Sequence, residues 1–177
     1  MSHVFWITGL SAAGKTTLAE LVVNRLRNLD KPVVLLDGDL LREAMGSGDG
    51  HDRAGRLRLA YKYAGLAKMI AIQDVMVVVS AVALFKEIHE WNRNNLPGYF
   101  EVFMKVSLDE LRKRDPKGIY AGYDKGQIKN VAGLDLDVDE PQKPNLLIEY
   151  SSGQTPEMAL EELWQRFETV YPNNNEL

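Results

Sequence analysis

Five short segments of the chain are apolar at almost every position, without the alternation of a half-exposed strand. Between them lie segments in which apolar residues recur every three or four positions, the spacing of an amphipathic helix. This order predicts an α/β fold, a three-layer sandwich with a five-stranded parallel sheet covered on both faces. The strands are expected at Val4–Thr8, Val33–Leu36, Asp74–Ala81, Tyr99–Val106 and Asn145–Tyr150, and the helices at Lys15–Asn28, Arg53–Gln73, Leu84–Asn92, Leu108–Arg114 and Pro156–Val170.

Polar residues follow the first three strands at their carboxyl ends. Gly9 opens a loop after the first strand, Asp37 and Asp39 follow the second, and Ser80 lies near the end of the third. Ligands of open parallel sheets bind at the edge formed by the carboxyl ends of the strands. We therefore expect the functional site at this edge.

One long segment, Pro116–Pro144, fits neither period. So long an irregular stretch in a compact domain is usually functional, and we expect a lid over residues 114–144. Its cations, among them Lys125 and Lys129, would neutralise charge on a transferring phosphoryl group. Its acidic end, Asp135–Glu140, lacks the glycine of a calcium loop and is expected to be a solvated turn.

Bulk composition limits the classes of protein that fit. The chain has 177 residues, a net charge of −4 and no cysteine. We expect a single domain over residues 1–177, without a basic field for nucleic acid, a disulfide framework or thiol catalysis. No signal peptide and no membrane span are predicted, so a cytoplasmic protein without a membrane partner is expected. The last residues, Tyr171–Leu177, are expected to fray.

The loop after the first strand matches a phosphate-binding motif in full. Gly9–Thr16 reads GLSAAGKT, which fits G-x-x-x-x-G-K-[ST], and it lies between a strand and a helix as the motif requires. Lys15 is expected to reach the β- and γ-phosphates of ATP, and the Thr16 hydroxyl to ligate Mg²⁺. The predicted nucleotide-binding residues are Gly9, Ser11, Ala12, Ala13, Gly14, Lys15, Thr16, Thr17 and, from the lid, Arg114.

Two classes of phosphate-loop protein are disfavoured by what the sequence lacks. It contains no N-K-x-D motif, which a GTPase needs to read guanine. The apolar strand that ends in Ser80-Ala81 does not carry the terminal Asp that motor ATPases use for metal and water. A small kinase remains, and the predicted fold is that of a P-loop nucleoside-kinase-like protein.

The segment Asp37–Arg42 (DGDLLR) is predicted to hold the acceptor. The Asp37 carboxylate would accept the proton of the acceptor hydroxyl or hold the water shell of the metal. Arg42 suits an anionic part of the acceptor. The alternative is an Asx-type turn that caps a helix. Arg53 and Arg56, three apart on one helix face, either bind the same anion or form an exposed basic face.

Together these segments resemble adenylylsulfate (APS) kinases, which use ATP to phosphorylate the 3′-hydroxyl of adenosine 5′-phosphosulfate. The resemblance implies a base or hydroxyl-positioning role for Asp37, and contacts of Arg42 and Arg53 with the phosphosulfate. It also implies that Ser80 and the lid residue Lys117 belong to the site. It runs from Val4 to about Tyr150 and rests on GLSAAGKTT, DGDLLR, Asp52–Arg53, RDPKGIY at Arg114–Tyr120, and the spacing to GLD…EP at Gly133–Pro141.

The sequence also departs from the family pattern. The acceptor-binding Asn of the family is Arg56 here, and its F-I-S-P-Y segment is VVSAV (Val78–Val82). The lid Phe that stacks on the acceptor's adenine is Val131. Stacking on an aromatic ring is worth roughly 1–3 kcal/mol per base, so its loss leaves the base of the acceptor open.

The expected function is phosphorylation of an activated, anionic nucleotide by MgATP. APS is the default acceptor by resemblance, giving 3′-phospho-APS for sulfate assimilation. Cytidine diphosphoramidate, the acceptor of APS-kinase-like proteins associated with capsule modification, is the close alternative. A nucleotide-binding regulator without turnover is a third possibility from another class. A homodimer is expected only because the family is often dimeric.

Overall fold

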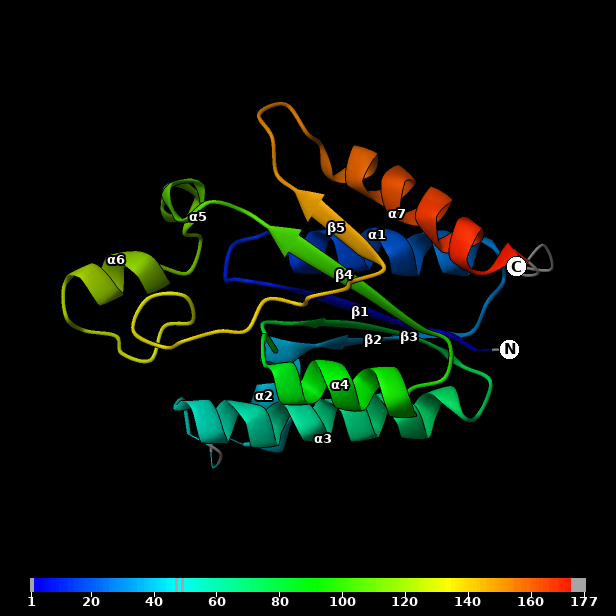
Figure 1. Ribbon diagram of the computed structural model, residues 1–177, viewed down its shortest axis with the longest axis horizontal. Coiled ribbons are helices and arrows are strands. Elements are labelled where there is room, and N and C mark those ends of the chain that lie inside the picture. Colours follow the sequence, from blue (N-terminus) through cyan, green and yellow to red (C-terminus); the bar gives the residue numbers. More distant parts are fainter. Residues whose placement is uncertain (1, 47, 49, 173–177) are drawn as a thin grey trace.

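A five-stranded parallel sheet forms the middle layer of the molecule (Figure 1). The structure is a computed structural model and describes residues 2–46, 48 and 50–172. The spatial order is β2-β3-β1-β4-β5, so β1 lies at the centre. The predicted strands are confirmed, with ends shifted by one or two residues. Their bounds are β1 Val4–Gly9, β2 Val33–Asp37, β3 Met76–Ala81, β4 Tyr99–Lys105 and β5 Leu146–Glu149.

Helices cover both faces of this sheet. Figure 1 shows α1 (Lys15–Asn28) and α7 (Pro156–Val170) on one face, and α3 (Arg53–Ala71) and α4 (Lys86–Asn95) on the other. The predicted three-layer sandwich is therefore confirmed. Two further helices are present: α2 (Gly38–Met45), of just over two turns, which only the capping-turn alternative for Asp37 implied, and α6 (Ile119–Asp124), of less than two turns, which was not predicted.

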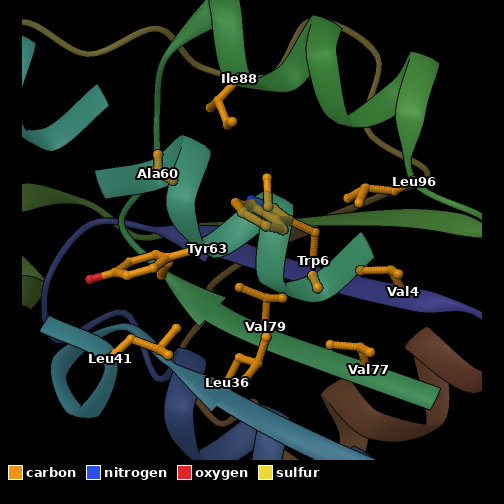
Figure 2. Packing of buried hydrophobic residues seen from close by; sticks show 14 of the residues in the cluster. Val4, Trp6, Leu36, Leu41, Ala60, Tyr63, Val77, Val79, Ile88 and Leu96 are labelled. Atoms are coloured by element: carbon orange, nitrogen blue, oxygen red, sulfur yellow. The ribbon is translucent and has the colours of Figure 1, made fainter. Parts of the chain in front are cut away.

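The core lies in two halves, one on each side of the sheet. Neighbouring residues of β1 alternate between them: Trp6 packs in the half under α3 and α4, and Phe5 packs in the half under α1 and α7. Figure 2 shows Trp6 and Tyr63 in the first half, surrounded by aliphatic side chains. Burial on both faces explains why β1, β3 and β4 are apolar without alternation. The edge strand β5 differs from the expectation, since it buries Leu146 and Ile148 but exposes Leu147 and Glu149.

The predicted lid emerges at the carboxyl ends of the strands. It follows α5 (Leu108–Arg114), contains α6, and returns in an irregular course to β5 (Figure 1). The acidic end of the lid is a turn with exposed carboxylates at Asp135, Asp137 and Glu140, as expected, but it also has a structural role. The Asp135 carboxylate accepts the backbone N–H groups of Asn130 and Val131, at 2.9 and 2.6 Å, and the acidic segment thereby shapes the lid.

The two ends of the described chain lie at the edge of the sheet opposite the lid (Figure 1). Residues 173–177 of the predicted frayed end lie outside the described residues. Within the described part of the chain, no helix is long and apolar enough to cross a membrane.

Candidate active site

The phosphate loop joins β1 to α1 in the conformation that its sequence predicts. A side chain at Gly9 would place its Cβ 2.6 Å from the Met104 carbonyl oxygen, so the loop can pass β4 only without one. Ala12 and Gly14 both have positive φ, 64° and 96°, which turns the loop tightly. The turn ends at the N-terminus of α1, where partial positive charge favours phosphate.

Lys15 lies inside this loop rather than in solvent. Its side chain is 9 % exposed, and its Nζ donates to the Leu10 carbonyl oxygen at 2.8 Å. Burial lowers the pKa of Lys15 to about 8, although the Asp39 carboxylate nearby acts in the opposite direction. An ammonium group that is largely shielded from water interacts strongly with a phosphate bound beside it, because the local dielectric constant is low.

Three oxygen-bearing side chains from three elements meet beside the loop. The Thr16 hydroxyl donates to Oδ2 of Asp37 at 2.9 Å and lies 3.3 Å from the hydroxyl oxygen of Ser80. Asp37 caps α2 through its other oxygen, which accepts the N–H groups of Asp39 and Leu40. Hydroxyl and carboxylate oxygens are ligands that suit Mg²⁺, so this donor set fits the predicted ion. Among the described residues no cluster of three His, Asp or Glu forms a separate metal site.

A first cavity lies beside these oxygens. Its volume is about 110 Å³, below the roughly 300–1,000 Å³ of pockets that hold small-molecule ligands. A nucleotide-sized acceptor therefore requires the wall of this cavity to move. Of the predicted residues, this cavity is lined by Ser11, Lys15, Thr16, Asp37, Asp39, Arg42, Arg56 and Ser80.

A second cavity, of about 760 Å³, lies on the other side of the phosphate loop. Its volume is large enough for a nucleoside, and Tyr150 and Gln154 line it near the end of β5. The Arg114 guanidinium stacks on the Tyr150 ring, 4.1 Å from its centroid. Predicted residues on this wall are Ala12, Ala13, Gly14, Lys15, Thr16, Thr17, Arg114 and Lys117.

The two arginines at the start of α3 have different surroundings. Arg56 lines the first cavity, and its guanidinium donates to the backbone oxygens of His51 and Asn130, at 2.9 and 3.0 Å. Burial, followed by the nearby Arg42, lowers the pKa of Arg56. Two clustered guanidinium groups with carbonyl partners leave positive charge available to an anion.

Arg53, in contrast, does not line the cavity. Its guanidinium forms a two-pronged hydrogen bond with Glu87, at 2.9 and 3.0 Å, and a third with Asp139 at 3.1 Å. These bonds connect the starts of α3 and α4 to the end of the lid. In this structure the positive charge of Arg53 is thus already compensated by two carboxylates.

The two predicted acceptor residues of the lid are also placed differently. Lys117 forms an ion pair with Asp39, so it connects the lid to the start of α2. Val131 is 4 % exposed and packs against Ala13, Leu111 and other members of a cluster under the lid, and it does not line the first cavity.

Sequence reasoning gave no role to several residues that shape the site. The Tyr63 hydroxyl donates to the Gly38 carbonyl oxygen at 2.9 Å, and the Phe85 ring forms part of the first cavity. A tyrosine inside a helical period looks like ordinary core, so no signal identified Tyr63. Tyr150, directly after β5, could have been found by the rule that ligands gather at strand ends.

Comparison with known proteins identifies the relatives of this arrangement. The chain is 38% identical over 140 residues to the cytidine diphosphoramidate kinase of Campylobacter jejuni. The aligned region covers 79% of this chain and 82% of that protein. It is 34% identical over 156 residues to a probable adenylyl-sulfate kinase of Pyrococcus abyssi, which covers 88% of this chain and 89% of that one.

A solved structure agrees with these sequence matches. The Mycobacterium tuberculosis APS kinase CysC, in complex with AMPPNP and APS, superimposes with a TM-score of 0.87 at 28% identity, over 94% of this chain and 98% of that one. The sequence model of the family described as Adenylylsulphate kinase matches residues 1–149. This chain therefore belongs to the adenylylsulphate kinase family, and it is a phosphotransferase with a hydroxyl group as acceptor.

Proposed function

We propose that this chain transfers the γ-phosphate of MgATP to the 3′-hydroxyl of an activated nucleotide, and that APS is the acceptor. The observation that carries the proposal is the hydrogen bond between Thr16 and Asp37, at 2.9 Å. It connects the phosphate loop, which borders both cavities, to the acceptor segment DGDLLR. A phosphate held by the loop and a hydroxyl held by Asp37 would thus be neighbours.

In this proposal the residues of the chain divide the chemistry between them. The loop and Lys15 would bind the β- and γ-phosphates and stabilise the negative charge that shifts toward the β-phosphate as the γ-phosphoryl group leaves. The oxygens of Thr16, Asp37 and Ser80 would hold Mg²⁺, which neutralises phosphate charge when it is bound. Asp37 would also orient the acceptor hydroxyl and accept its proton.

The cationic wall of the first cavity supports an anionic acceptor. Arg42 and Arg56 both line this cavity, and Lys117 stands beside it through its ion pair with Asp39. Arginine guanidinium groups bind phosphate-like oxygens in a two-pronged manner, which suits the phosphosulfate of APS. Closure of the lid would exclude water from the transferred group.

Cytidine diphosphoramidate is a second candidate acceptor, favoured by a specific observation. The lid offers no aromatic ring at Val131, whose side chain is packed in the cluster beneath the lid. An adenine base therefore lacks the stacking partner that the family provides, whereas the anionic diphosphate end would still meet Arg42 and Arg56. The relative with 38% identity is itself named a cytidine diphosphoramidate kinase.

One measurement separates the candidates. ADP release is followed with MgATP and, in parallel, APS, cytidine diphosphoramidate and a free sugar, with the Lys15→Ala variant as the blank. Preferred turnover of APS supports the first proposal, and turnover of the cytidine compound alone replaces it with the second. Tight MgATP binding without ADP release on any acceptor would contradict both and indicate a nucleotide-binding regulator. The expected homodimer stays a prediction, which light scattering tests.

A further inference from the structure

The carbonyl groups of the phosphate loop are held from outside by the lid. The Tyr120 hydroxyl, on α6, donates to the Ser11 carbonyl oxygen at 2.9 Å. The Arg114 guanidinium donates to the carbonyl oxygen of the next loop residue, Ala12, at 3.5 Å. A loop binds phosphate by turning N–H groups inward, so its carbonyl groups face outward and require partners there.

Tyr120 is built into the lid as a rigid donor. Its side chain is 1 % exposed and packs against Ala13 and Leu111. The Asp115 carboxylate fixes the start of α6 by accepting the backbone N–H groups of Tyr120 and Ala121, at 3.3 and 2.9 Å. Burial raises the pKa of Tyr120 to about 12, so the hydroxyl stays protonated and able to donate throughout the physiological range.

The lid touches the loop at a second point, on the other side of Ser11. Gly133 has a φ of +82°, and a Cβ added there would lie 2.9 Å from Cδ1 of Leu10. The Leu10 side chain thus fits against the bare backbone of the lid. With Tyr120 on Ser11 and Gly133 on Leu10, the lid supports two consecutive residues of the phosphate loop.

We infer that Tyr120 is a positioning residue for nucleotide binding, because its hydroxyl keeps the Ser11 carbonyl turned away from the phosphates. Docking of the lid and the binding shape of the phosphate loop are then one coupled event. The inference rests on the proposed function only in that the loop binds MgATP. It needs no statement about which acceptor is phosphorylated.

Binding of MgAMPPNP measured by calorimetry tests this inference, with Tyr120→Phe as the variant. The substitution keeps the ring and removes only the hydroxyl. We expect the Kd for MgAMPPNP to rise about three- to tenfold, the loss that follows when one hydrogen bond is removed. The KM for ATP should rise by the same factor, while the KM for the acceptor stays close to that of the wild type.

Tyr123→Phe is the matched control. Tyr123 belongs to the same helix and the same cluster, and its hydroxyl has no hydrogen-bond partner among the described residues. This variant should bind MgAMPPNP as the wild type does. Equal weakening by both variants, or a lower thermal midpoint of Tyr120→Phe with unchanged affinity, would mean that Tyr120 only packs the lid and would overturn the inference.

Amide hydrogen exchange gives an independent measurement, because coupling between two sites is reciprocal. MgAMPPNP should slow exchange over Ile119–Asp124 in the wild type and have a smaller effect in Tyr120→Phe. Equal protection of both proteins would contradict the coupling. Since binding needs no acceptor, a chain that binds MgAMPPNP but phosphorylates none of the acceptors refutes the proposed function and leaves this test valid.

Discussion

The Thr16 hydroxyl donates a hydrogen bond to the Asp37 carboxylate at 2.9 Å, although the two residues are 21 positions apart in the sequence. Thr16 is the second residue of α1, directly after the phosphate loop, and Asp37 is the last residue of β2. Ser80, at the end of β3, pairs with Asp37 in the sheet register and completes the group. The parallel sheet thus brings together the oxygens that we propose to bind the metal and the acceptor hydroxyl.

Replacement of Asp37 by Asn should abolish most turnover without unfolding the protein. Asn caps a helix about as well as Asp, so we expect the free energy of unfolding to change by less than about 0.5 kcal/mol. The amide cannot accept the acceptor's proton, and kcat should fall by about 10²–10⁴-fold. Steady-state kinetics and chemical denaturation measure the two effects.

Asp52→Asn is the control for that substitution, because Asp52 caps α3 through a hydrogen bond from the Gly55 N–H at 2.8 Å. It repeats the chemical change at a cap outside both cavities and should leave kcat near that of the wild type. Near-normal kcat of Asp37→Asn would exclude the proton-accepting role.

Lys117→Met should lower kcat more than it weakens nucleotide binding. Lys117 lines the second cavity and pairs with Asp39, which lines the first, so its charge stands between the cavities proposed for the two substrates. We expect kcat to fall by about ten- to a hundredfold, because a cation near the transferring phosphoryl group stabilises the transition state. Lys125→Met is the matched control. Contrary to the expectation from the sequence, Lys125 lines neither cavity and is exposed just after α6, so this variant should retain full activity.

Val131→Phe should destabilise the protein rather than create a stacking surface for adenine. Val131 is 4 % exposed in the cluster with Leu111 and Tyr120, so a larger side chain overfills a packed space. Overpacking costs about 1–3 kcal/mol, which thermal unfolding would register as a lower midpoint. A lower KM for APS with an unchanged midpoint would show instead that residue 131 reaches the acceptor.

Glu101 gives the protein a defined dependence of stability on pH. It is 0 % exposed on β4, where it accepts hydrogen bonds from Tyr99 and Arg93, and burial raises its pKa. The folded state therefore holds the proton of Glu101 more tightly than the unfolded state does. The resulting stabilisation is present below the ordinary pKa of glutamate and is lost as the pH rises through the folded pKa.

Glu101→Gln removes this titration. Urea unfolding of the variant should show a weaker decline in stability than that of the wild type as the pH rises above the ordinary pKa of glutamate. Glu161→Gln, at an exposed position paired with Arg25, should keep the wild-type slope. Identical slopes for the wild type and Glu101→Gln would contradict the assignment of the titration to Glu101.

The sequence by itself determined the five strands, the two-sided sheet and the phosphate loop. These features depend on local patterns: runs of apolar residues for buried strands, and glycines at fixed spacing for a loop that must turn tightly. The position of Asp37 at a strand end was also readable, because parallel strands bring their carboxyl ends to one edge.

Only the tertiary structure decided which charged residues are available to a ligand. Arg53 and Arg56 share a helix face, yet Glu87 and Asp139 bind the guanidinium of Arg53, whereas Arg56 lines the first cavity. The apolar side chain of Val131 is likewise taken up by other segments, since it packs with Leu111 and Tyr120 under the lid. Side-chain partners that come from distant segments compete with the ligand for each group, and no local pattern records where those segments meet.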